Sequence, residues 1–431
     1  MVNGILQSFL GALQASISIL LVIFYGVLAN QYKLLDGAAS KKIAKVCVHM
    51  FLPALLITKV GSELHADTGT RYVPILIWSL FFILVSVGIG LVAVRVFKLP
   101  AYVTPALAFN NTTSLPLLLI ESLETTGILD KLLTDGDTVS KAISRAESYF
   151  LVCALVSNSL TFALGPRLLA ADKEPEQEDQ DDEESEAEQN GDANGDAEHG
   201  EDNDDEQTSL LPNRVRKNQD KFQARAFHLG KQLWDKIPQR AQGALSFMSD
   251  FANPPLIGAV IGAILGLVPP LHRVFFNDTE EGGFFKAWLT QSISKIGQLF
   301  VTLQVVVVGV SLSASLQKVK RGEDKTLPWG STLFILGIRF IIWPVLSIAI
   351  IWLLATKTNL LLDDPILWFT MALMPTGPPA MILVAMAEVS GASEDEKMTI
   401  SKILTFSYAA SPVLALTVVG ALYASQAAIS K

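Results

Sequence analysis

Two polar, proline-containing stretches interrupt long apolar segments of this chain: Phe-Asn-Asn-Thr-Thr-Ser-Leu-Pro-Leu-Leu at 109–118 and Leu-Met-Pro-Thr-Gly-Pro-Pro-Ala-Met at 373–381. Neither stretch can continue as a regular helix. Pro378 and Pro379 remove two consecutive N–H donors and clash with the preceding turn. In the first stretch, consecutive polar side chains compete for the backbone hydrogen bonds. Both stretches therefore predict a helix that stops and starts again.

Around these stretches the chain consists of apolar blocks long enough to cross a bilayer. Hydrophobic residues make up 50% of the 431 residues. A spanning helix needs about 20 apolar residues, and backbone polar groups in lipid must be satisfied within the segment, so the spans are helices. We predict an all-α polytopic membrane protein with ten transmembrane helices, at roughly 5–29, 42–61, 73–97, 102–121, 148–170, 253–271, 287–315, 329–355, 365–388 and 400–425.

A polar segment at 171–250 divides the blocks into two sets, within 1–170 and 251–431. Residues 172–206 hold 19 Asp and Glu against one basic residue, Lys173, and such a composition predicts disorder. The second half is basic with interleaved aromatic residues, which fits an amphipathic helix on an anionic leaflet or a solvated linker equally well. Without the −18 of the acidic stretch the net charge of −9 becomes +9, so the acidity is local and predicts no nucleic-acid partner.

Lysine and arginine gather in the loops after the first and seventh predicted helices. Because positive loops favour the cytosolic side, we expect the 171–250 segment to be cytosolic and both termini to lie on the opposite side. Two sets of five helices must then be inverted relative to each other. The interruptions fall in helices 4 and 9, at matching positions of the two sets. Paired broken helices of this kind indicate the binding site of a transporter.

Proline suits the first turn of a helix. New half-helices are therefore expected near Pro116, with Ser114 or Thr113 as cap, and near Pro379, with Thr376 as cap. Each N-terminus exposes unpaired N–H groups and a partial positive charge, so two converging ends favour an anion. Two simple proline kinks are the structural alternative. The predicted substrate contacts here are Asn110, Asn111, Thr112, Thr113, Ser114, Pro116, Thr376, Gly377, Pro378 and Pro379.

Three further polar residues lie within predicted spans. Arg339 is expected to face the bundle interior, where it holds helix C-terminal carbonyls or attracts the substrate; snorkelling to the membrane surface is the alternative. Asn158 and Gln304 could line the binding cavity, and hydrogen bonding between helices explains them equally well. No Asp or Glu pair within the spans stands out as a proton carrier. No phosphate-binding loop, metal motif or catalytic pattern is present, so we expect no enzyme, cofactor or metal.

Several motifs together resemble the auxin efflux carrier superfamily, in the fungal form of its PIN-like (PILS) branch. They are the two broken stretches, Arg339, Asn-Pro-Pro-Leu-Ile-Gly at 253–258 and Gly-Leu-Val-Pro at 266–269. The resemblance implies two inverted five-helix repeats, crossing broken helices 4 and 9, a scaffold and a transport domain, a homodimer, and elevator-like exchange of an anion. Plant members carry indole-3-acetic acid. By motif, it places the crossing on Pro116 and Pro379 and a substrate contact on Asn111.

The predicted function is membrane transport of a small amphipathic organic anion, with auxin-like indole carboxylates as the family-level candidate. A non-transporting membrane sensor or regulator and an anion channel are the alternatives. The PIN-like branch implies the endoplasmic reticulum. The acidic dileucine pattern Glu-Gln-Thr-Ser-Leu-Leu at 206–211 offers a vacuolar or endosomal membrane instead. Membrane lipid and a second copy of the chain are the other expected partners.

Overall fold

The computed structural model describes residues 2–65, 69–134, 136–169, 254–320, 328–389 and 392–429. They all belong to one compact unit, formed by Met1–Asp172 and Asp250–Lys431. The regular elements in these ranges are helices, as the sequence predicts. The predictions for 171–250, which are disorder, a basic amphipathic helix and a sorting pattern, lie outside the described residues.

The helices of the first half follow the predicted blocks with longer ends. They are α1 (Val2–Gln31), α2 (Gly37–Val46), the π-helical turn η1 (Cys47–Phe51), α3 (Leu52–Glu63), α4 (Tyr72–Phe97), α5 (Val103–Ala108), α6 (Ser114–Glu124) and α7 (Val139–Leu169). The turn η1 joins α2 and α3 into one continuous stretch, Gly37–Glu63. Helix α7 begins at Val139, well before the predicted start at 148, which brings several charged residues into the bundle.

The second half contains two further broken or bent segments. Its elements are α10 (Pro254–Leu267), α11 (Pro269–Phe276), η6 (Lys286–Thr290), α12 (Gln291–Lys320), α13 (Trp329–Gly337), the π-helical turn η7 (Ile338–Ile342), α14 (Trp343–Lys357), α15 (Pro365–Leu373), α16 (Ile382–Val389), α17 (Glu394–Ala409) and α18 (Leu414–Ile429). The predicted continuous span 253–271 is wrong. The chain bends by 102° between α10 and α11, because Pro269 and Pro270 cannot donate to the turn before them.

Within the described ranges, seven helical stretches are long and apolar enough to cross a membrane. They are Ile5–Gln31, Gly37–Glu63, Gly69–Phe97, Val139–Gly165, Lys286–Ala314, Trp329–Lys357 and Ser411–Ile429. The bent pair α10 and α11 would make an eighth. Large apolar side chains point outward from these helices, as on α4, where Ile77 is 63% exposed while Phe82 on the inner face is fully buried. Such outward apolar faces are typical of helices in lipid.

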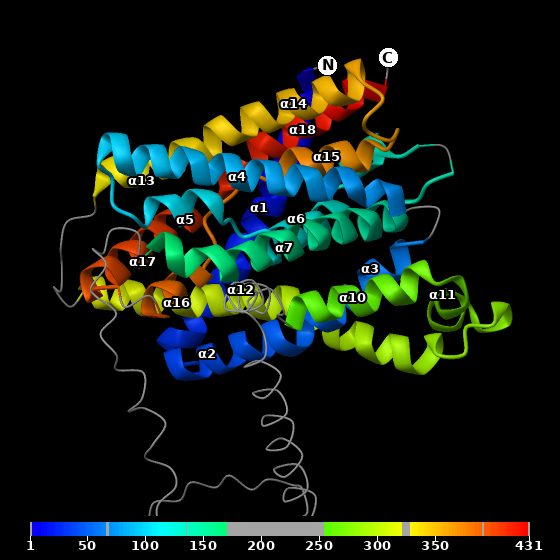
Figure 1. Ribbon diagram of the computed structural model, residues 1–431, viewed down its shortest axis with the longest axis horizontal. Helices are drawn as coiled ribbons and strands as arrows, with labels where there is room; N and C mark the ends of the chain where they lie inside the picture. The colour runs from blue at the N-terminus through cyan, green and yellow to red at the C-terminus, as the bar shows by residue number, and fades with distance from the viewer. Residues whose placement is uncertain are drawn as a thin grey trace, which may run out of the picture. The chain divides into compact units, whose positions relative to one another are not determined.

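The helices can be divided into two groups, which also pack on each other through α1 with α6 and α18, α12 with α6 and α17, and α3 with α7 (Figure 1). In the first helix group, α1 packs on α12, and α3 packs on α10 and α12; α2 and α11 complete it. In the second helix group, α4 packs on α5 and α7, and α14, α15 and α18 pack on one another; α6, α13, α16 and α17 belong to it as well. In Figure 1 the second group fills the upper and central part of the bundle, and α2, α3 and α10–α12 lie along its lower side.

The backbones of α1 and α12 are in direct contact. A Cβ atom at Gly26 would overlap the carbonyl oxygen of Val306, and one at Gly309 would overlap that of Ile23. Small residues allow such close approach between membrane helices. The two glycines therefore fix the central packing of the first helix group.

Candidate functional site

The two broken segments cross and pair through their backbones. Asn110 and Pro379 form an antiparallel bridge. The Asn111 N–H donates to the Pro378 carbonyl at 3.1 Å, and the Ala380 N–H donates to the Phe109 carbonyl at 3.0 Å. Pro378 and Pro379 have no N–H to donate, so the two backbone donors of the bridge are Asn111 and Ala380. The breaks thus satisfy each other's backbone groups inside the bundle, as an apolar environment requires.

The C-terminus of α15 is held by side chains from two other elements. The Asn110 amide donates to the Met374 carbonyl at 2.8 Å and to the Thr376 carbonyl at 2.9 Å. Arg339, fully buried in the π-helical turn η7, donates to the Pro375 carbonyl at 3.1 Å. A helix C-terminus carries partial negative charge, so a cation and amide donors stabilise it. Arg339 therefore faces the interior and contacts helix-terminal carbonyls, one of its expected roles; snorkelling is wrong, and a substrate contact stays a prediction.

The start of α6 lies close to the predicted position, but its capping differs. Helix α6 begins at Ser114, and Thr113 occupies the cap position without a side-chain hydrogen bond to the helix. The side-chain Oδ1 of Asn111 instead accepts from the Thr113 N–H at 3.3 Å and from the Ser114 hydroxyl at 3.2 Å. Asn111 thereby orders the entry to the half-helix.

The predicted cap of the other half-helix is wrong. Helix α16 begins at Ile382, three residues after Pro379, and the Thr376 hydroxyl donates backwards to the Leu373 carbonyl at 2.7 Å. The residues between Thr376 and Ile382 explain this difference. Gly377 adopts φ +97°, a left-handed conformation that glycine permits, and the following prolines form the bridge before the helix resumes.

Asn111 has a partner that the sequence does not reveal. Its amide donates to the Ser114 hydroxyl at 3.1 Å and to the Tyr408 hydroxyl at 3.0 Å. Tyr408 lies on α17 and is fully buried. In the sequence it is one aromatic residue in a largely apolar segment, so no local pattern marks it.

A small cavity of about 30 Å³ lies beside the crossing. Four of the residues around it are polar: Ser16, Asn111, Thr376 and Ser411. The Ser411 hydroxyl is buried and has no hydrogen-bond partner among the described residues. The other lining residues are Ile19, Leu115, Pro116, Leu119, Phe150, Leu373, Gly377, Pro378 and Leu414. A cavity of this size holds about one or two water molecules, so a larger ligand requires the walls to separate.

The structure brings most of the predicted site residues together, with two exceptions. Asn110, Asn111, Thr113, Ser114 and the 376–379 stretch meet at the crossing. Thr112 is buried there with its hydroxyl unpartnered in the described part of the chain, and Pro116 lines the cavity. Asn158 on α7 and Gln304 on α12 neither line this cavity nor share a described hydrogen bond with the crossing. Four residues of the site were not predicted from the sequence: Ser16, Phe150, Tyr408 and Ser411.

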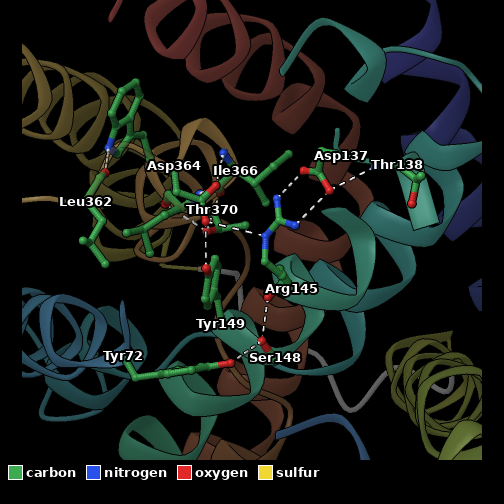
Figure 2. Close-up of polar contacts among 12 residues, drawn as sticks. Tyr72, Asp137, Thr138, Arg145, Ser148, Tyr149, Leu362, Asp364, Ile366 and Thr370 are labelled. Atoms are coloured by element: carbon green, nitrogen blue, oxygen red, sulfur yellow. Dashed lines mark hydrogen bonds and ion pairs between the residues drawn. The ribbon is translucent and has the colours of Figure 1, made fainter. Parts of the chain in front are cut away.

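A polar network anchors the start of α15 to α7 (Figure 2). Arg145 donates to the Asp137 carboxylate at 3.0 and 2.5 Å and lies 3.6 Å from that of Asp364. The Tyr149 hydroxyl donates to Asp364 at 2.8 Å. Asp364 in turn caps α15 by accepting from the Ile366 N–H at 3.0 Å. The hydrogen bonds from Arg145 hold the pKa of Asp137 below its ordinary value.

A buried carboxylate lies in the same region. Glu147 on α7 is 6% exposed and forms an ion pair with Lys59 on α3. The prediction that no pair of carboxylates within the spans stands out as a proton carrier stays a prediction, but one carboxylate that the predicted span 148–170 left out lies inside α7. The cause is the early start of α7 at Val139, which places Glu147 inside the helix rather than before it.

Comparison with known proteins gives consistent matches. The profile of the family described as "Membrane transport protein" matches residues 12–419. The chain is 25% identical to "Uncharacterized transporter C5D6.04" of Schizosaccharomyces pombe over 433 residues, covering 92% of this chain and 91% of that one. It is 27% identical to "Protein PIN-LIKES 5" of Arabidopsis thaliana over 172 residues, 40% of this chain and 39% of the relative. For "Protein PIN-LIKES 2" of the same plant the identity is 29% over 140 residues, 32% and 28% of the two chains.

The match of the family profile covers nearly the whole bundle, including both broken segments and the cavity between them. The relatives in Arabidopsis thaliana carry the PIN-LIKES name, and the relative in fission yeast matches over nearly its full length. The crossing at Asn110 and Pro379 lies within the matched part of the chain. This chain therefore belongs to the auxin efflux carrier family of membrane transport proteins, in its PIN-like branch.

Proposed function

We propose that this protein is a carrier of small amphipathic organic anions, with auxin-like indole carboxylates as the first candidates. The observation that supports it most is the backbone crossing of the broken segments next to a cavity with apolar walls and four polar residues. Apolar walls suit the body of such a ligand, and a few polar groups orient its head. Helices α6 and α16 both begin near the crossing, so the partial positive charge of their N-termini favours a carboxylate.

We propose ten spans in two inverted sets, with α17 outside the count. Seven continuous stretches and the bent pair α10 and α11 give eight. The pairs α5 with α6 and α15 with α16 are each interrupted by the crossing, so none of their parts reaches spanning length alone. Counting each pair as one broken span gives ten. The crossing then lies between equivalent helices of two sets that run in opposite directions.

Transport requires the cavity to enlarge and to open alternately to each side. A second apolar cavity of about 10 Å³ lies against Pro379, between α5, α16 and α17. All parts of the crossing belong to the second helix group. We propose that this group moves as a unit against the first, in an elevator-like way. The family further suggests a homodimer in the endoplasmic reticulum membrane with the 171–250 segment in the cytosol.

The test is solid-supported-membrane electrophysiology on the full chain in liposomes, with indole-3-acetate and aliphatic carboxylates of similar size as probes. We expect a saturable current for at least one anion. The variant Pro379→Ala should nearly abolish it, because the new N–H has no acceptor at the bridge and the helix can extend. The matched control Pro365→Ala changes a first-turn proline, where a missing N–H has little consequence, and should keep the current.

Three other outcomes would contradict the proposal. Binding of the probe without any current would indicate a sensor or regulator. A current that does not saturate would indicate a channel. A wild-type current in Pro379→Ala would remove the crossing from the mechanism.

A further inference from the structure

The ion pair between Lys59 and Glu147 joins the two helix groups. Lys59 lies on α3 of the first group and Glu147 on α7 of the second, and α3 and α7 pack together there. The ion pairs of Arg145 and Lys286, in contrast, stay within one group. Arg145 pairs with Asp137 and Asp364 inside the second group, and Lys286 pairs with Asp278 inside the first. Any sliding of one group past the other must therefore separate Lys59 from Glu147.

The surroundings of this pair carry an excess of negative charge. Glu63 on α3 and Glu124 on α6 act electrostatically on Glu147, and Glu121 on α6 interacts with both members of the pair. Arg145, the nearest arginine along α7, is already engaged by two aspartates (Figure 2). Arg145 and Arg71 also act on Glu63, and Lys59 acts on three carboxylates, those of Glu147, Glu63 and Glu121. A proton bound to one of them relieves their mutual repulsion.

The two side chains of the ion pair differ in their exposure to solvent. The Glu147 side chain is 7% exposed, whereas that of Lys59 is 25% exposed. Glu147 is therefore held almost entirely by protein contacts, and Lys59 connects it to the surface. A buried carboxylate that loses its cation is strongly destabilised unless it becomes neutral. Separation of the groups and neutralisation of Glu147 should then occur together.

We propose that Glu147 is a proton-binding residue whose protonation breaks the ion pair with Lys59 and frees the second helix group to move against the first. This inference rests on the movement in the proposed function, and it adds a proton site away from the anion site. In the step, a proton from water adds to a Glu147 carboxylate oxygen, and the carboxyl group becomes neutral. Lys59 keeps its charge and remains beside Glu63 and Glu121. Release of the proton restores the pair.

Distance measurement between the groups tests the inference without a substrate. Spin labels are attached to cysteines introduced by Thr125→Cys, just after α6, and Phe284→Cys, in the connection between α11 and η6. Both positions are exposed. The buried native cysteines are replaced by Cys47→Ala and Cys153→Ala. Double electron–electron resonance is recorded on the full chain in liposomes between about pH 8 and about pH 5.

We expect one main distance at high pH and a second one whose population rises at least about threefold on acidification. Glu147→Gln, which mimics the protonated carboxyl, should show the second distance at every pH. The charge exchange Lys59→Glu with Glu147→Lys should restore the main distance at high pH, which a purely packing role of either side chain would not predict. The control Lys286→Gln breaks an ion pair within one group and should behave as wild type.

Two results would overturn the proposal: a wild-type distribution that does not change with pH, or a Glu147→Gln variant that still responds to pH as wild type does. The titration of the labelled protein with Lys59 and Glu147 unchanged needs no substitution at the pair, so poor folding of a pair variant cannot conceal the first result. Failure of the proposed function gives a different pattern. In that case the pH-dependent distance persists while liposomes show no anion current.

Discussion

Replacing Asn110 by alanine should destabilise the protein markedly, because this one side chain closes the open end of α15. Its amide donates to the carbonyls of Met374 and Thr376 at 2.8 and 2.9 Å, and Asn110 itself is 3% exposed. Each buried acceptor left without a donor costs about 1–3 kcal/mol, so the two together cost about 2–6 kcal/mol. We expect a value in the lower half of that range, since the alanine leaves room for a water molecule.

The measurement is equilibrium unfolding in mixed micelles, followed by the reaction of Cys47 and Cys153 with a thiol dye, because both thiols are buried in the folded protein. Asn277→Ala is the matched control. It removes the same amide from an exposed hydrogen bond to Glu281 and should change the free energy of unfolding by no more than about 0.5 kcal/mol. Equal stabilities of the Asn110 and Asn277 variants would refute the proposed cap of α15.

Three further predictions use the same preparation. Gly26→Ala should lower the free energy of unfolding by about 1–3 kcal/mol, because the new methyl group overlaps the Val306 carbonyl oxygen; an unchanged value would contradict the close packing of α1 on α12. Arg145 lowers the pKa of Asp137, so the stability that Asp137→Asn removes should be fully present above about pH 4 and disappear as the pH falls through the lowered value; a difference between wild type and variant that grows on acidification would have the wrong sign. Ser411→Ala should weaken anion currents while changing the free energy of unfolding by less than about 0.5 kcal/mol, because its hydroxyl has no described partner; an unchanged concentration dependence of the current would exclude Ser411 from the binding site.

Much of the candidate site could be predicted because breaks in helices are local events. The prolines at 378 and 379 and the polar run from Asn110 to Ser114 determine where a helix cannot continue, whatever surrounds them. The buried position of Arg339 followed from the cost of a charge in lipid. The detailed caps could not be predicted in this way. Thr376 turned out to close α15 rather than open α16, because the left-handed Gly377 reverses the chain first.

Contacts between residues far apart in the chain could not be predicted from the sequence. Ser411 and Phe150 carry no motif. Phe150 reaches the cavity because α7 packs beside α6 and α15, and Ser411 because the short turn before α18 packs on α1. Glu147 was missed for a related reason. Its burial depends on the start of α7 at Val139 and on its ion pair with Lys59 of α3, and neither can be inferred from the length of an apolar block.

The sequence alone determined that this is a helical membrane protein with two interrupted segments, since apolar length and the missing N–H of proline are properties of the chain itself. Tertiary structure decided what meets at the interruptions. Asn110 caps a helix 264 residues away, and Asn111 bonds a tyrosine 297 residues away. Hydrogen bonds and ion pairs act over a few ångströms in space. Only the folded arrangement of the two helix groups could therefore select these partners.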